Sequence, residues 1–173
     1  MDHLMPGAEQ DQDVFPVDAY KFAMRKVPSP VAVITTCVDG VRYGLTATAV
    51  CSATTQPPTI LVCVNQAAAT CSIIRDAGIF AVNFLSDIQS DIARLFSTPR
   101  LSAEKRFSKG HWGQAKTGSP VLRDTASSFD CTLVEAIPQG RHMLFLGSVV
   151  DATSSAESGL LYRDGSFRRL ATE

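Results

Sequence analysis

The sequence predicts a mainly β protein, an antiparallel barrel decorated by short helices. Many short runs of β-branched and apolar residues are spread along the chain, as in VAVITT and TILVCV. Turn signals such as Asp39-Gly40 and Asp164-Gly165 join neighbouring runs into hairpins. The stretches with helical periodicity are few and short. With 173 residues, the chain has the length of one ordinary domain.

The composition indicates how far the folded domain extends and which classes of partner are not expected. Residues 1–14 are polar and acidic, and we expect a flexible tail there, followed by one domain over residues 15–173. Apolar residues make up 45% of the chain, which is enough to form a proper core. The formal net charge of −1 gives no indication of nucleic acid or an anionic membrane as a partner.

The five cysteines indicate a reducing environment. None are spaced as C-x-x-C, so neither a zinc ribbon nor a thioredoxin-like motif is predicted. Most lie in apolar runs, where a free cysteine acts as a small hydrophobe. Because no secretory signal and no apolar run of membrane-spanning length is found, we expect a cytoplasmic protein.

In the first half of the chain, Asp18 is expected to cap a helix over residues 19–26, which Pro28 and Pro30 end. The β-branched and apolar runs then predict strands over residues 31–36, 41–49, 50–54, 59–64 and 79–85. TILVCV is continuously apolar, and we expect that strand to be central and buried on both faces. A helix is predicted over residues 67–76, with Gly78 after its end.

The second half opens with an amphipathic helix over residues 87–96. Residues 98–118 are polar and irregular, and so long a loop is usually functional or mobile. Further strands are predicted over residues 129–137 and 142–152, joined by a turn at 138–140. A closing hairpin is predicted over residues 160–170. The whole chain thus has seven or eight strands and two or three short helices.

The standard catalytic signatures are missing from the sequence. It has no G-x-G-x-x-G dinucleotide turn, no P-loop and no G-x-S-x-G elbow. The three histidines are scattered without the spacing of metal ligands. If the protein is an enzyme, we expect a bound cofactor to supply the difficult chemistry.

The stretch YGLTATAVCS, residues 43–52, combines small residues with hydroxyl groups. Small side chains let the backbone approach a flat ligand closely. On a strand, Thr46 and Thr48 point to one face. The alternative is that threonine is simply a good strand former.

The order of several motifs identifies a family. The chain runs through P-S-P-V-A-V-I-T-T, Y-G-L-T-A-T-A, Q-P-P-T-I-L-V-C-V-N, I-F-A-V-N-F-L, K-R-F and G-R-H-M-L-F-L-G-S-V. In this order and spacing, over about residues 18–170, the sequence resembles the short-chain NAD(P)H:flavin oxidoreductases, the reductase components of two-component flavin-dependent monooxygenases. The resemblance implies a split β-barrel of Greek-key type that binds FMN, with a homodimer as its usual assembly.

The resemblance also implies a set of site residues. Thr46, Ala47 and Thr48 would contact the flavin, although many relatives have asparagine in place of Thr48. His142 would lie near the flavin and the nicotinamide, as the one candidate catalytic residue. The remaining cofactor-binding candidates are Pro30, Val31, Ser52, Cys63, Val64, Asn65, Thr70, Ser72 and Phe107. For Thr70 and Ser72 the expected ligand is a phosphate at a helix N-terminus, with ordinary helix-start residues as the alternative.

The function implied is reduction of FMN or FAD by NADH or NADPH, which supplies reduced flavin to a partner monooxygenase. A relative of the same fold that reduces a dedicated acceptor such as a corrinoid is one alternative. A flavin-binding module without turnover is another, and a purely structural barrel would bind no flavin. No residue distinguishes FMN from FAD, or NADH from NADPH.

Overall fold

The computed structural model describes residues 15–171, so the predicted tail over residues 1–14 lies outside the described residues. Four short helices are present: α1 (Val17–Met24), α2 (Ala69–Ala77), α3 (Ser90–Ser97) and α4 (Ala103–Arg106). The strands are β1 (Ser29–Pro30), β2 (Ala32–Val38), β3 (Val41–Ala47), β4 (Val50–Thr55), β5 (Pro58–Asn65), β6 (Ile79–Phe84), β7 (Trp112–Gln114), β8 (Pro120–Leu122), β9 (Ser127–Gln139), β10 (His142–Ser154), β11 (Leu161–Arg163) and β12 (Ser166–Arg168). The predicted class, mainly β with short helices, is confirmed.

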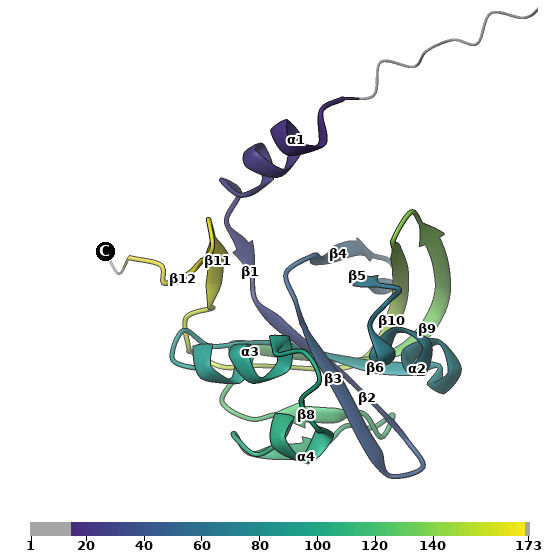
Figure 1. Cartoon of the computed structure of the whole chain (residues 1–173). Helices are drawn as coiled ribbons and strands as arrows, with labels where there is room; N and C mark the ends of the chain where they lie inside the picture. The colour runs from purple at the N-terminus through teal and green to yellow at the C-terminus, as the bar shows by residue number, and fades with distance from the viewer. Residues whose placement is uncertain (1–14, 172–173) are drawn as a thin grey trace, which may run out of the picture.

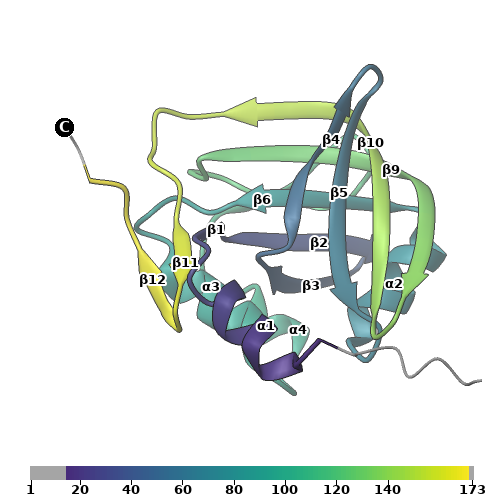
Figure 2. The ribbon, with the colours of Figure 1, turned by 90° about the horizontal axis from the view of Figure 1, so that it is seen from above.

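Seven strands form one antiparallel sheet in the order β3-β2-β6-β9-β10-β5-β4. The sheet wraps round on itself, so that β5 and β10 run across the direction of β2 and β6 (Figures 1 and 2). β3 and β4 follow each other along the chain yet lie at opposite ends of this sheet. The barrel is therefore open between them, as expected of a split barrel.

Strands β9 and β10 are long because one part of each follows the direction of β6 and the other part follows the direction of β5. The register between them shifts at Leu146/Gly147 and again at Val149/Asp151, and such bulges bend a strand pair. Gly147 lies at the first bend, where the ring of Phe80 packs directly against its backbone. A side chain at this position would occupy the volume that the ring fills.

The apolar residues form two cores. The larger one fills the barrel and includes Ile34, Val62, Phe80, Val82 and Phe145, each at most 1% exposed. The second lies between the barrel and the α3–α4 region. It contains Val31, Val33, Leu85, Ile92, Ala93, Phe96, Phe107, Leu122 and Leu160.

The predicted strand TILVCV is present as part of β5, but the expectation that it is buried on both faces is wrong. β5 lies between β10 and the end strand β4, and its side chains alternate between buried and partly exposed. Ile60, Val62 and Val64 point into the barrel, whereas Leu61 and Cys63 lie on the other face. A continuous apolar run does not distinguish a strand buried on both faces from one next to the sheet edge.

Two boundary predictions also differ. The first helix begins at Val17 after Pro16, so Asp18 lies in its first turn and caps nothing. Pro138 and Gln139 belong to β9, and the turn to β10 is made at Gly140 and Arg141. The closing hairpin is present as β11 and β12.

The predicted irregular loop over residues 98–118 contains α4 and β7 instead. Buried polar side chains hold the part that follows. The amide of Asn83, which is fully buried, accepts from the Leu122 N–H at 2.8 Å, and the Thr35 hydroxyl donates to the Pro120 carbonyl. The Asp130 carboxylate accepts from the Thr117 N–H at 2.8 Å. These contacts between distant residues order a segment that has no local pattern.

None of the helices in residues 15–171 has the length and apolarity needed to cross a bilayer.

Candidate functional site

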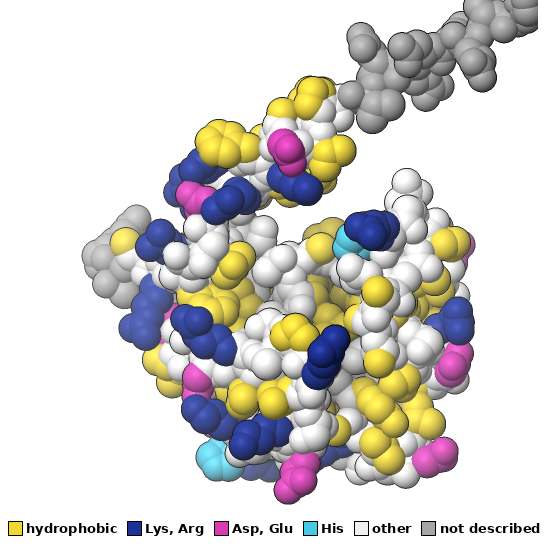
Figure 3. Space-filling view, in the orientation of Figure 1, with side chains coloured by type: hydrophobic (Ala, Val, Ile, Leu, Met, Phe, Trp, Pro, Cys, Tyr) yellow, Lys and Arg dark blue, Asp and Glu magenta, His cyan; other side chains and the backbone are white. Residues whose placement is uncertain are grey.

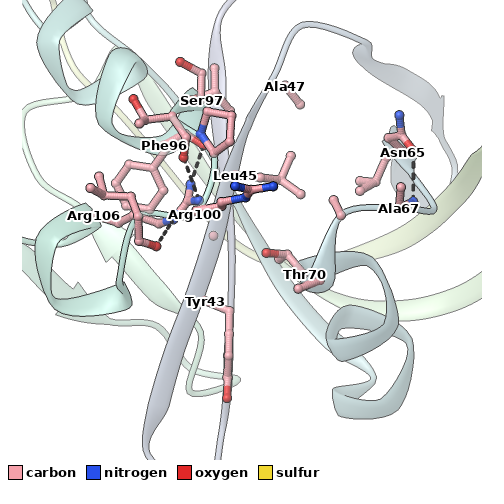
Figure 4. Close-up of a pocket in the computed structure, with 18 of the residues that line it drawn as sticks. Tyr43, Leu45, Ala47, Asn65, Ala67, Thr70, Phe96, Ser97, Arg100 and Arg106 are labelled. Carbon is pink, nitrogen blue, oxygen red and sulfur yellow. Dashed lines mark hydrogen bonds between the residues drawn. The ribbon is translucent and has the colours of Figure 1, made fainter.

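A cavity of about 860 Å³ opens between the end of β3, the start of α2 and the loop from α3 to α4 (Figure 4). Its volume is in the range of small-molecule and cofactor sites. The lining residues come from four parts of the chain: residues 42–49, residues 63–70, residues 96–106 and His142. The opening of the barrel is thus also the site of this cavity.

The β3 wall lies on an end strand of the sheet, where Gly44, Thr46 and Ala47 are small and Arg42, Tyr43 and Leu45 are larger. A Cβ on Gly44 would lie 2.7 Å from the ring of Phe96 and 3.0 Å from the Ile34 carbonyl oxygen, so only glycine fits there. The Thr46 hydroxyl donates to the Ala93 carbonyl at 2.8 Å, which fixes β3 against α3. Thr48 follows the end of the strand and is exposed. Backbone and small side chains therefore form this wall over residues 46–49.

The α2 wall presents the start of a helix. Ala68 is its N-cap residue and supplies no side-chain hydrogen bond to the first turn. The Asn65 side chain accepts from the Ala67 N–H at 2.9 Å and thereby shapes the approach to the helix. Thr70 is buried and lines the cavity. First-turn N–H groups without a cap can bind an anion.

The third wall is the loop from α3 to α4, and Arg106 holds it. Its guanidinium donates to the carbonyls of Phe96 at 2.7 Å, Thr98 at 2.9 Å and Leu101 at 3.2 Å (Figure 4). Burial lowers the pKa of Arg106 from its usual value, although the group stays charged at neutral pH. Within this loop, Arg100 has the left-handed backbone angle φ = 57°.

An aromatic cluster of Phe96, Phe107 and Trp112 packs beside this loop. Phe107 is only 6% exposed, and its ring meets Phe96 and Trp112 at centroid distances of 5.0 and 4.7 Å. The guanidinium of Arg42 lies 4.5 Å from the centre of the same ring. The surroundings of Phe107 are thus already filled, which does not fit the prediction that it stacks on a flavin or nicotinamide.

The charged side chains around the cavity are all positive. Arg42, Arg100 and Arg106 line it, and no aspartate or glutamate does. Burial, with a smaller contribution from Cys51, raises the pKa of the Cys63 thiol, which therefore stays uncharged at neutral pH. The cavity is suited to an anionic ligand.

A second cavity of about 510 Å³ adjoins the first and shares Thr46, Thr48 and Ser97 with it. Its wall includes Tyr162 and Phe167 of the closing hairpin, whose ring centroids are 5.4 Å apart. Arg94 lies 5.1 Å from the centre of the Phe167 ring. Two ligands can therefore meet at Thr46 and Thr48.

The structure brings most of the predicted site residues together. The first cavity is lined by Thr46, Ala47, Thr48, Cys63, Val64, Asn65, Thr70 and His142. Val31 lines the second cavity. Neither of the two cavities includes Pro30, Ser52, Ser72 or Phe107.

Ser52 and Ser72 are placed away from the cavity for clear reasons. Ser52 is an exposed residue of β4, opposite Ile60. The Ser72 hydroxyl donates to the Ala69 carbonyl at 3.1 Å, within its own helix. This contact corresponds to the alternative that Ser72 is an ordinary helix-start residue.

Sequence reasoning missed the arginines Arg42, Arg94 and Arg100. No local pattern marks them, because they come together only when α3 and the loop after it fold against β3. The K-R-F motif did include Arg106, but its role in holding the loop was not predicted.

The comparisons with known proteins agree with this geometry. Residues 24–171 match the family model of the flavin reductase like domain. The FMN reductase (NADH) RutF of Variovorax paradoxus (strain S110) is 36% identical over 170 residues, which cover 98% of this chain and 93% of that protein.

Solved structures share the fold. A Haemophilus somnus 129PT protein described as a flavin reductase superimposes with a TM-score of 0.87 at 36% identity, over 90% of this chain and 100% of that one. BorF, the flavin reductase component of a bacterial two-component tryptophan halogenase, gives a TM-score of 0.83 at 27% identity, over 91% and 100% of the two chains. The match of the family model over nearly the whole domain shows that this chain belongs to the flavin reductase-like family.

Proposed function

We propose that the protein is an NADH-dependent flavin reductase. The observation that carries the proposal is the first cavity, which combines a wall of small residues with an uncapped helix start and unopposed arginines. The similarity to the FMN reductase (NADH) RutF supports flavin as the ligand and NADH as the electron donor.

The residues of the cavity fit a flavin. Its flat ring needs a wall without bulky side chains, and residues 46–49 offer one. Its phosphate needs N–H donors and positive charge, and α2 and the arginines offer both. A bound flavin would supply the acceptor for a hydride from the nicotinamide.

The chain itself mainly has to position the two ligands. β3 holds the flavin through backbone and small residues, while the second cavity has room for a further planar group beside Thr46 and Thr48. His142 is exposed at the start of β10, opposite Asn65, and lines the cavity wall. We infer that its imidazole orients the nicotinamide or the flavin.

The test is NADH oxidation by purified protein with a large excess of FMN or FAD, followed by the loss of nicotinamide absorbance. Turnover far beyond the amount of protein would mean that reduced flavin leaves the site. A yellow protein that oxidises no NADH would contradict the proposal and favour a dedicated acceptor or a binding module. If the protein neither binds flavin nor oxidises NADH, its likeness to the family would be one of fold alone.

Replacing His142 by alanine should lower kcat/KM for NADH by about tenfold, the effect of losing one polar contact to the reacting pair. Steady-state kinetics at saturating FMN measure this effect. His111→Ala, which removes an exposed imidazole outside both cavities, is the matched control and should keep wild-type turnover. Equal turnover of the two variants would exclude a role for His142 in the reaction.

We further propose that two copies assemble through α1. No residue of this helix is buried, and its apolar side chains stand out from the body of the molecule (Figure 3). Phe22 is 66% and Tyr20 58% exposed. An isolated helix of eight residues is marginal in water, so an apolar surface of a second copy is needed to cover it.

The variant Phe22→Ser should therefore shift the protein from dimer to monomer in sedimentation equilibrium, because it removes apolar area from the contact. Val134→Ser, which alters an equally exposed valine on β9, is the control and should leave the dimer intact. A monomeric wild-type protein would refute this assembly.

The acceptor of the reduced flavin is proposed by analogy with BorF, which belongs to a two-component halogenase. We infer a separate flavin-dependent oxygenase as partner, working in the cytoplasm. The five free cysteines agree with a reducing compartment. Mixing the reductase, NADH and flavin with a candidate oxygenase, and assaying its product, tests this pairing.

A further inference from the structure

The starting point is the charge around the first cavity. Three guanidinium groups, those of Arg42, Arg100 and Arg106, line it together with His142, and no carboxylate faces them. Unopposed positive charge in a cavity favours an anionic ligand. The three arginines are not equally free to bind one.

Two of them are already engaged. Arg106 is hydrogen-bonded to the carbonyls of Phe96, Thr98 and Leu101. Arg42 lies over the Phe107 ring. Arg100, by contrast, has no side-chain hydrogen bond and no ion pair within residues 15–171. Among the three arginines of the cavity, it is the one that neither a hydrogen bond nor an aromatic ring holds in the part of the chain that the structure describes.

The backbone around Arg100 is held in place. Arg106 binds the carbonyls of Thr98 and Leu101, on either side of Arg100, and these bonds set the path of the loop. Arg100 itself has φ = 57°, an uncommon angle for a residue with a side chain. In Figure 4 it lies beside Arg106 and Leu45, on the side of the cavity that faces α2 and Thr70. The loop thus carries the guanidinium to the cavity without a contact to hold it there.

We propose that Arg100 binds the phosphate of the flavin, across the cavity from the start of α2. This inference rests on the proposed function and extends it by naming a residue that selects phosphorylated flavins over riboflavin. A guanidinium pairs with phosphate through two parallel N–H···O bonds, and the uncapped N–H groups of α2 complete the site from the other side. The isoalloxazine ring then extends toward Thr46 and Thr48.

The experiment compares the dissociation constants of FMN and riboflavin, which share the ring and differ in the phosphate. The variant is Arg100→Asn, because asparagine tolerates the left-handed backbone and removes the charge without forcing the loop to change. FMN affinity should fall by about tenfold to a hundredfold, the loss of a charge-assisted contact. Riboflavin affinity should change by less than about twofold. Quenching of flavin fluorescence gives both constants without turnover.

Two further variants make the test specific. Arg100→Lys keeps the charge but loses the planar fork, and should recover only part of the FMN affinity. Arg123→Asn removes an exposed arginine that lines neither cavity, and should leave both constants unchanged. Thermal unfolding of each variant shows that the fold is retained.

Equal losses for FMN and riboflavin, or no loss for either, would overturn the role of Arg100 while leaving the flavin reductase intact. A wild-type protein that binds neither flavin would instead overturn the proposed function together with this inference. The same titrations therefore separate the two failures.

Discussion

The Gly147→Ala variant is expected to lose about 3 kcal/mol of its free energy of unfolding, at the upper end of the usual cost of overpacking a core. An added Cβ would lie 2.7 Å from Cε1 of Phe80 and 2.9 Å from the Cβ of Cys131. Phe80 and Cys131 are fully buried, so neither can move aside without disturbing the barrel core. Urea unfolding followed by circular dichroism measures the loss.

The control is Gly159→Ala, because no atom lies within 4 Å of the Cβ that it would add. It should leave the stability within about 0.5 kcal/mol of wild type. Combining Gly147→Ala with Phe80→Leu should recover part of the loss, since the smaller side chain makes room for the methyl group. If Gly147→Ala is as stable as wild type, the close packing at this bend is not a constraint.

A loss of both stability and flavin affinity is expected from Arg106→Gln. This change removes the guanidinium that binds the carbonyls of Phe96, Thr98 and Leu101, and so releases one wall of the flavin cavity. The free energy of unfolding should fall by about 2 kcal/mol, in line with the loss of charge-assisted hydrogen bonds. The affinity for both FMN and riboflavin should fall by more than about tenfold, because the wall itself is displaced.

Arg106→Lys tests whether charge alone is enough. A lysine is a point charge on a flexible stem and cannot reach the three carbonyls together, so it should rescue little. Lys105→Gln changes the adjacent residue, whose side chain makes no hydrogen bond or ion pair in residues 15–171, and should behave as wild type. Full rescue by lysine would show that the hydrogen-bond geometry of Arg106 is unimportant.

The positions of the main strands along the chain were largely predictable, because each of these strands carries its own local pattern. VAVITT, TILVCV and IFAVNFL have the β-branched and apolar composition of strands, and Asp164-Gly165 marks a hairpin. The burial of β5 was not predictable, since it depends on which strand lies beside it in the sheet. The prediction of an irregular loop over residues 98–118 was incomplete for a related reason, because groups distant in the chain, such as the Asp130 carboxylate that accepts from the Thr117 N–H, help to order the segment.

The residues of the candidate site also divide into those that the sequence could predict and those that it could not. Thr46, Thr48, Asn65 and His142 belong to motifs that the family shares, and the structure gathers them around one cavity. Arg100 belongs to no motif and reaches the cavity only through the path of its loop. Phe107 belongs to the K-R-F motif, but the motif does not indicate whether its ring packs on a ligand or in the core.

The position of β3 and β4 at the two ends of the sheet has a consequence for handling the protein. Each has one side without a neighbouring strand, and exposed edges of this kind are templates for aggregation. β4 carries mostly small, uncharged residues, which offer little electrostatic protection against pairing with another chain. A flavin in the cavity would cover part of the β3 edge, so we expect the flavin-bound protein to aggregate less than the free protein.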